Sequence, residues 1–191
     1  MNVRTLLPLG AALLVGVAGC GSDSSSGSGS GSTEAGATSS TAESTVLPVE
    51  ENPITNTSTN AVLEVTYAAL EDNVDPETGD AIDDCLELTL RNTGTEPLTD
   101  LEVYYEFTDV TTGDSEGYHQ ELGDLEVPAG GETTVFFDNQ TGAGHYPENE
   151  FSIYRSSANQ VDVAVQVSAP AAQVATATAS KEAGTDEEED D

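Results

Sequence analysis

The sequence has almost no positive charge: its 191 residues include four Lys or Arg against 36 Asp or Glu. A protein that binds nucleic acid directly needs basic side chains to neutralise phosphates. The scarcity of basic residues therefore excludes DNA and RNA as direct partners.

Residues that commonly carry metal, redox or sugar-binding chemistry are also scarce. The chain has two histidines, His119 and His145, two cysteines, one methionine and no tryptophan. A zinc or copper site usually needs three or four nitrogen or sulfur ligands, so we expect no metal and no cofactor. Glycoside hydrolysis needs two carboxylates beside the scissile bond and aromatic walls for the sugar. Because the chain has no tryptophan, it has few aromatic side chains for the walls of such a cleft. No catalytic residue is predicted.

The N-terminus is typical of an export signal. Arg4 precedes an apolar stretch at residues 6–17, which is too short to span a bilayer but fits the hydrophobic region of a signal peptide. Residues 17–20 (VAGC) resemble the lipobox of bacterial lipoproteins. This resemblance implies that residues 1–19 are removed and that lipid on Cys20 anchors the chain to the extracytoplasmic face of the cell membrane. The alternative is an ordinary secretory signal followed by an accidental cysteine.

Two segments have the composition of disordered chain. Residues 20–60 start with the cysteine to be lipidated and continue mainly with Ser, Gly and Thr, which bury too little apolar surface to fold. Residues 170–191 pass from Ala and Thr repeats into an acidic run that repels itself. We expect a flexible tether and a solvated tail, with one small domain at residues 61–169 between them.

The domain has the period-two alternation of half-buried strands. Apolar residues recur at every second position around residues 63–67, 86–90, 101–107 and 161–167, and Leu63, Val65 and Tyr67 are expected to share one face. Weaker strands are predicted at residues 118–125, 133–137 and 151–155. About seven short strands with Gly, Pro and Asn between them predict an all-β fold, a single antiparallel β-sandwich.

Three segments of the domain carry a family resemblance. They are residues 88–94 (LTLRNTG), 98–109 (LTDLEVYYEFTD) and 125–132 (LEVPAGGE). They resemble immunoglobulin-like modules of bacterial and archaeal surface proteins, particularly FxLYD-type domains, in which an aromatic, spacer, apolar, aromatic, Asp pattern ends one strand. Thr108 departs from the second aromatic, and Asp109 ends the pattern. The resemblance implies an immunoglobulin-like sandwich and no catalytic residue.

The acidic residues are spread over the whole domain. Between residues 61 and 169 there are 24 Asp or Glu against Arg91 and Arg155 only. Removing Arg4 with the signal peptide leaves three basic and 36 acidic residues, a formal charge of −33. Two interpretations stay open: adaptation to high salt, where counterions screen the repulsion, and an acidic envelope protein in an ordinary medium.

Three local features are candidates for sites. The acidic segment at residues 72–84 offers oxygen ligands that Ca²⁺ prefers, but without EF-hand spacing, so a solvated loop and a Ca²⁺ site both stay open. Cys85 falls on the polar-facing phase of its strand beside Asp83 and Asp84, without a neighbouring base or positive charge to activate it, so we expect an inert thiol. Lipidation of Cys20 would also exclude an intramolecular disulfide. Residues 142–150 (GAGHYPENE) are expected to form a structured turn.

These features together predict a membrane-anchored, extracytoplasmic lipoprotein. It would present a non-catalytic immunoglobulin-like module with a structural role or with an envelope protein or cell-wall ligand as its partner. The alternative is a surface hydrolase or a Ca²⁺-dependent accessory subunit of an envelope complex. A concave pocket lined by two carboxylates would favour the hydrolase.

Overall fold

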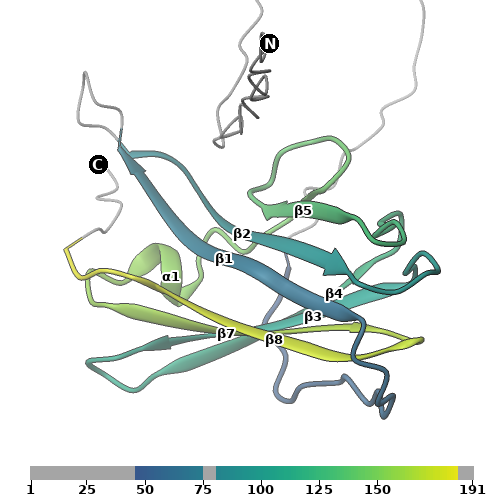
Figure 1. Ribbon diagram of the computed structural model, residues 1–191. Coiled ribbons are helices and arrows are strands. Elements are labelled where there is room, and N and C mark those ends of the chain that lie inside the picture. Colours follow the sequence, from purple (N-terminus) through teal and green to yellow (C-terminus); the bar gives the residue numbers. More distant parts are fainter. Residues whose placement is uncertain (1–45, 75–80, 185–191) are drawn as a thin grey trace, which may run out of the picture.

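The computed structural model describes residues 46–74 and 81–184, which form a β-sandwich of two four-stranded sheets (Figure 1). One sheet has the order β1 (Leu63–Val74), β2 (Ala81–Asn92), β5 (Glu132–Phe137), β6 (His145–Tyr146). The other has the order β4 (Ser115–Leu122), β3 (Leu101–Asp109), β7 (Val161–Ala169), β8 (Ala172–Lys181). Neighbouring strands are antiparallel except β5 and β6, which are parallel. The predicted β-sandwich is confirmed, with eight strands in the described residues.

The alternating strands bury their apolar faces between the two sheets. Leu88, Val103, Phe107 and Val165 are each at most 4% exposed, as the alternation predicts. The ring of Tyr105 packs edge-on against that of Phe107, with centroids 5.4 Å apart. The ring of Tyr105 also contacts that of Phe137 in β5 of the opposite sheet, with centroids 5.3 Å apart. Such aromatic pairs stabilise the packing of the two sheets beyond the area that they bury.

Strand β1 departs from strict alternation. The pairing of β1 with β2 shifts register between Val65 and Tyr67, and such a bulge reverses which side chains face inward. Leu63 is buried, whereas Tyr67 is 50% exposed. The prediction that Leu63, Val65 and Tyr67 share one face is therefore wrong for Tyr67.

Residues 151–155 do not form the predicted strand but lead into the short helix α1 (Ile153–Ser156). The side-chain oxygen of Ser152 accepts a hydrogen bond from the backbone N–H of Arg155, which is a helix N-cap. Just before the helix, Oδ1 of Asn149 accepts a hydrogen bond from the backbone N–H of Phe151. These local hydrogen bonds outweigh the weak strand pattern of the segment.

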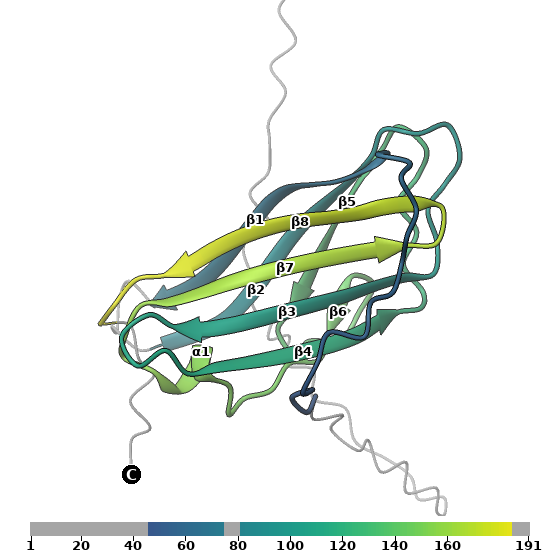
Figure 2. The same ribbon diagram turned by 90° about the horizontal axis from the view of Figure 1, so that it is seen from below.

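Residues 46–60 lie on the domain instead of belonging to the expected tether. Figure 2 shows this segment, which we call the strap, crossing the outer face of the sheet that contains β3 and β7. Val49 pairs with Gly117 of β4, and Asn52 donates to Gln166 of β7 at 3.0 Å. The prediction of a linker over residues 20–60 is therefore wrong from residue 46 onward.

Asparagines hold the far end of the strap. The amide nitrogen of Asn56 lies 2.9–3.1 Å from three oxygens, Oγ of Ser168 and the carbonyls of Ala169 and Ala172. Asn60 accepts from the backbone N–H of Gln173 at 2.7 Å. The strap thus stays ordered through side-chain hydrogen bonds to backbone, which a count of apolar residues does not predict.

The predicted tail at residues 170–191 also contains a strand. Residues 172–181 form β8, which pairs with β7 over most of its length. Small residues such as Ala175 face inward while Thr176 and Thr178 are exposed. Alternating Ala and Thr is weakly apolar, yet it fits the edge of a sheet because β-branched threonine favours strands. The expected disorder is therefore wrong for these ten residues.

Candidate functional site

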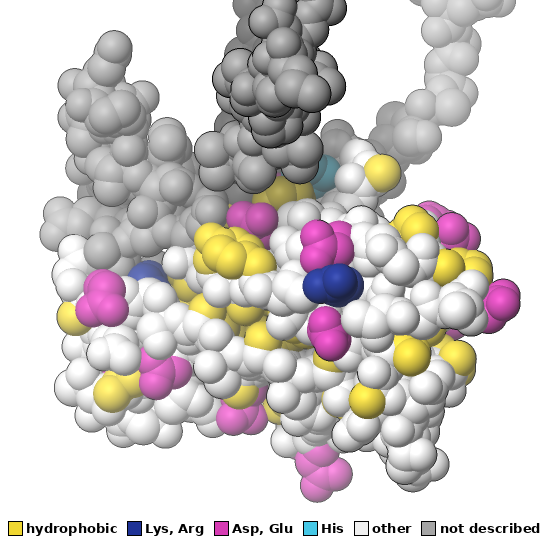
Figure 3. Space-filling model, viewed as in Figure 1, with side chains coloured by type: hydrophobic (Ala, Val, Ile, Leu, Met, Phe, Trp, Pro, Cys, Tyr) yellow, Lys and Arg dark blue, Asp and Glu magenta, His cyan; other side chains and the backbone are white. Residues whose placement is uncertain are grey.

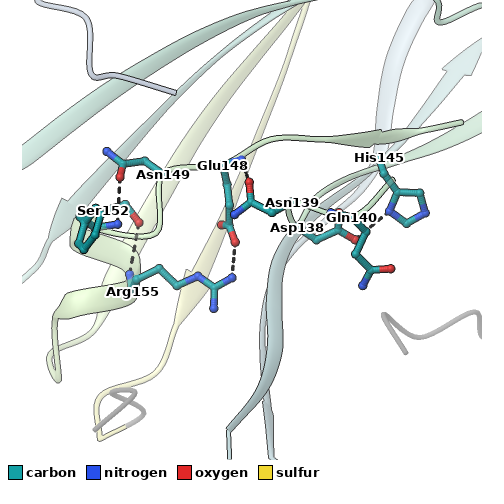
Figure 4. A network of polar contacts seen from close by, with 9 residues as sticks. Asp138, Asn139, Gln140, His145, Glu148, Asn149, Ser152 and Arg155 are labelled. Carbon is teal, nitrogen blue, oxygen red and sulfur yellow. Dashed lines mark hydrogen bonds and ion pairs between the residues drawn. The ribbon is translucent and has the colours of Figure 1, made fainter. Parts of the chain in front are cut away.

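The segment between β5 and β7 holds a histidine in a fixed position (Figure 4). Nδ1 of His145 lies 2.8 Å from a carboxylate oxygen of Asp138, whose side chain is fully buried. The imidazole stacks on Phe136 with centroids 5.2 Å apart. Because a carboxylate only accepts, Nδ1 donates the proton. The hydrogen bond and the stacking leave the other ring edge for a ligand.

An ion pair joins the same segment to α1. Glu148 accepts from the guanidinium of Arg155, and their side chains are only 7% and 12% exposed. The backbone N–H of Glu148 donates to Oδ1 of Asn139 at 2.8 Å. Buried ion pairs stabilise a structure only with further hydrogen bonds, so this network (Figure 4) holds the turn at residue 139 against α1.

A surface pocket of about 770 Å³ opens beside His145. Its lining includes three carboxylates from the end of β4 and the segment after it, together with residues of β5 and β6. The lining residues that matter here are Glu121, Asp124, Glu126, Thr134, His145 and Tyr146. A volume of this size is in the range of small-molecule sites.

The loop that forms one wall approaches β5 closely because Gly144 has no side chain. Its φ is +86°, and a Cβ there would lie 3.0 Å from the carbonyl oxygen of Thr134. The wall also brings Tyr146 near the carboxylates: burial, followed by the charge of Asp124, raises the pKa of Tyr146. The pocket therefore combines hydrogen-bond acceptors with a phenol that stays protonated.

The second histidine occupies a different place. Nε2 of His119 in β4 lies 3.0 Å from a carboxylate oxygen of Glu102 in β3, on the outer face of their sheet. The described residues, 46–74 and 81–184, contain no group of three or more His, Cys, Asp or Glu that could hold a metal ion.

Asp109, the last residue of the aromatic-to-Asp pattern, has a structural position. Its carboxylate accepts from the side chains of Ser157 at 2.6 Å and Asn159 at 2.8 Å, and from the backbone N–H groups of Thr111 and Thr112. These hydrogen bonds, that of Ser157 first, hold the pKa of Asp109 well below its usual range. The residue joins the β3–β4 turn to the segment before β7.

Comparison with known proteins adds no functional assignment. No protein-family model and no curated protein matches the chain. Among solved structures, a β-glucuronidase from glycoside hydrolase family 2 is 10% identical with a TM-score of 0.38, over 63% of this chain and 12% of the enzyme. The Pseudomonas fluorescens alkylpurine DNA glycosylase AlkC is 17% identical with a TM-score of 0.36, over 64% of this chain and 31% of the glycosylase. The matches cover small parts of those chains and carry no argument about activity.

Cys85 differs from its prediction. Its neighbour Leu86 points into the core, so Cys85 keeps the outward phase that alternation predicts, but it is fully buried. In the part of the chain that the structure describes no cysteine is free, and Cys85 is disulfide-bonded. The expectation that an intramolecular disulfide is excluded therefore disagrees with this structure, and it depends on whether Cys20 carries lipid.

Cys20 lies outside the described residues. Of the acidic segment at residues 72–84, the structure describes only the strand backbone at 72–74 and 81–84, so the Ca²⁺ site remains a prediction. No helix in the described ranges is long and apolar enough to cross a membrane.

Sequence reasoning missed the carboxylates of the pocket. Glu121, Asp124 and Glu126 lie in a short stretch at the end of β4 and just after it, but they are three among 24 acidic residues between residues 61 and 169. Only the packing of residues 142–146 against this stretch distinguishes them. The predicted turn at residues 142–150 contributes a wall of the pocket through His145 and Tyr146.

Proposed function

We propose that this chain is an exported lipoprotein, anchored through Cys20 to the extracytoplasmic face of the cell membrane. The observation that carries the proposal is the VAGC motif at residues 17–20, placed after a short apolar stretch. Residues 21–45 would then span roughly 25 to 30 Å as a Gly- and Ser-rich coil between lipid and domain.

The anchor is tested by replacing Cys20. Wild-type protein should partition into the detergent phase and incorporate labelled lipid, whereas Cys20→Ala should lose both the label and cleavage before residue 20. Wild-type protein in the aqueous phase would contradict the anchor.

The disulfide of Cys85 makes a second test necessary. The chain has two cysteines, and a sulfur that carries diacylglycerol cannot also form a disulfide. The mass of the N-terminal peptide, measured with and without reduction, distinguishes the two states. A thioether-linked diacylglycerol on Cys20 would support the anchor, and an N-terminal peptide released only by reduction would contradict it.

We further propose that the sandwich is an immunoglobulin-like binding module whose ligand occupies the pocket beside His145. Ionised carboxylates only accept hydrogen bonds, so Glu121, Asp124 and Glu126 favour a ligand rich in amine or hydroxyl donors, as cell-wall polymers and basic peptides are. The phenol of Tyr146 offers such a ligand a further hydrogen bond. The partner is thus an envelope protein or a cell-wall ligand.

Titration with oligolysine and with N-acetylglucosamine oligomers tests the pocket. The NMR chemical shifts of the backbone amides of Thr134 and Tyr146 should change on binding. The double variant Asp124→Asn, Glu126→Gln should weaken the affinity about tenfold or more. Asp114→Asn, in the turn at the other end of β4, is the control for the lost charge. If neither probe shifts these amides, the pocket is not the binding site.

A hydrolase remains a second candidate because the pocket is lined by more than two carboxylates. Two carboxylates across a scissile bond can act as acid and base or nucleophile. Release of shorter oligomers during the same titration, abolished in Glu121→Gln, would favour hydrolysis. Binding without turnover would favour the non-catalytic module.

A further inference from the structure

The sequence contains two Asn-x-Ser/Thr tripeptides that the proposed function does not use. They are Asn56-Thr57-Ser58 and Asn139-Gln140-Thr141. In exported proteins the side-chain amide of this asparagine is the acceptor of N-linked glycans, provided that the position is accessible. The two asparagines differ in how accessible their side-chain amides are in the structure.

Asn56 is not available in the folded protein. Its amide nitrogen is directed at three oxygens of β7 and β8, at 2.9–3.1 Å. Its Oδ1 accepts from the backbone N–H of Ser58 at 2.8 Å. A glycan on this nitrogen would remove one of its two hydrogens and place a sugar between strap and sheet. Modification of Asn56 is therefore incompatible with the docked strap.

Asn139 has the opposite surroundings. It is exposed in the turn after β5, with a φ of +57°, and Thr141 is exposed as well. Of its side-chain atoms in the described structure only Oδ1 is engaged, as the acceptor for the backbone N–H of Glu148. Within residues 46–74 and 81–184, no hydrogen bond from its Nδ2 is present. Asparagine tolerates this left-handed conformation better than most residues, so a glycan can be attached without changing the turn.

We propose that Asn139 is the N-glycosylation site of the exported protein, a proposal that rests on the export argued above. The co-substrate is an oligosaccharide linked to a polyprenyl phosphate or diphosphate. The amide nitrogen of Asn139 forms the bond to the anomeric carbon, the carbon–oxygen bond to the lipid phosphate breaks, and the amide proton leaves to a base of the transferase. The hydroxyl of Thr141 supplies the recognition element of the tripeptide.

The turn that would carry the glycan belongs to the polar network that also holds His145, a lining residue of the candidate pocket. Asn139 directly follows Asp138, the partner of His145, and Figure 4 shows these residues in one network. The oxygen that accepts from Glu148 stays in place after modification, because the glycan is carried by the nitrogen. The network therefore holds the modified asparagine in the orientation seen here.

The test is the mass of the full chain purified from the membranes of its own cells. Peptides that contain Asn139 should carry a glycan mass, and those with Asn56 should not. Asn139→Gln and Thr141→Ala should each remove the modification. Thr141→Ser is the matched control, since serine keeps the tripeptide competent, and Asn56→Gln should leave the mass of the glycan unchanged.

Lipid labelling of the same sample separates this proposal from the anchor. A lipidated chain without glycan at Asn139 overturns the glycosylation alone, and a glycosylated chain without lipid overturns the anchor alone. A chain with neither overturns both. A glycan at Asn56 overturns the selectivity, and hydrogen exchange of the backbone N–H of Gln173 would then report the loss of the strap.

Discussion

Asp109 joins three parts of the chain at one end of the sandwich. It ends β3, caps the turn that leads to β4, and accepts from two side chains in the segment before β7. The aromatic-to-Asp pattern thus has a physical basis, because Tyr105 at its first aromatic position and Phe107 at its apolar position fill the core while the aspartate fixes the turn.

Asp109→Asn should lower the melting temperature at pH 7, and the difference from wild type should shrink below about pH 4. The carboxyl has a pKa of about 3.9 in an unfolded chain, whereas the folded protein holds the pKa well below that value. The stabilisation is complete above the unfolded pKa and is lost as the pH falls toward the folded one. Melting curves from pH 7 to pH 2 measure this. Asp114→Asn, exposed in the same turn, should have little effect at any pH.

Gly117 is required by the side chain that lies over it. A Cβ at this position would be 2.4 Å from the hydroxyl oxygen of Tyr104 and 2.9 Å from two ring carbons. We expect Gly117→Ala to destabilise the domain by about 1–3 kcal/mol, because the ring must move. Urea unfolding measures the loss. Gly123→Ala is the control, since no atom lies within 4 Å of its Cβ position, and equal effects would contradict the steric argument.

At the scale of elements, the alternation of apolar and polar residues predicted the central strands. It did not predict the strap or β8, whose positions depend on hydrogen bonds and edge pairing. Residues 161–167 alternate strictly and form β7, since burying one apolar face decides the structure of a central strand. The strap and β8 are fixed by hydrogen bonds of Asn56 and by edge pairing, which leave little apolar signal. The pocket was not predictable, because its walls come from segments that only tertiary packing brings together.

Truncation of a core residue tests the phase of the strands. Phe107→Ala should cost about 3–5 kcal/mol and Leu88→Ala about 2–5 kcal/mol, because both side chains are almost fully buried. Thr178→Ala on the exposed face of β8 should stay within about 0.5 kcal/mol. Glu102 is less suitable as a control because it pairs with His119. Free energies from denaturant unfolding that are similar for Phe107 and Thr178 would contradict the phase.

At the scale of the whole molecule, charge of one sign dominates. Residues 46–184 contain 27 acidic and three basic residues, a formal charge of −24. Figure 3 shows acidic side chains scattered over the visible face and basic ones in small spots only. Of the basic residues, Lys181 is buried and donates to the backbone carbonyls of Tyr154 and Ser157. Arg91 lies 4.0 Å from Glu132, and Arg155 pairs with Glu148. Most of the surface repulsion is therefore left for solvent ions to screen.

The domain should therefore become more stable as salt increases. The Debye length falls from about 10 Å at 0.1 M to about 3 Å at 1 M, so repulsion between surface carboxylates is screened in the folded state. In the unfolded chain the charges are farther apart and gain less. Each kcal/mol gained should raise the melting temperature by about 2–8 °C. The measurement is a series of melting temperatures of residues 46–191 from 0.1 to 3 M NaCl, repeated in choline chloride.

An equal rise of the melting temperature in both salts indicates general screening, whereas a flat or falling curve contradicts adaptation to high salt. A full gain from micromolar Ca²⁺ alone would instead assign the acidic segment at residues 72–84 as a binding site.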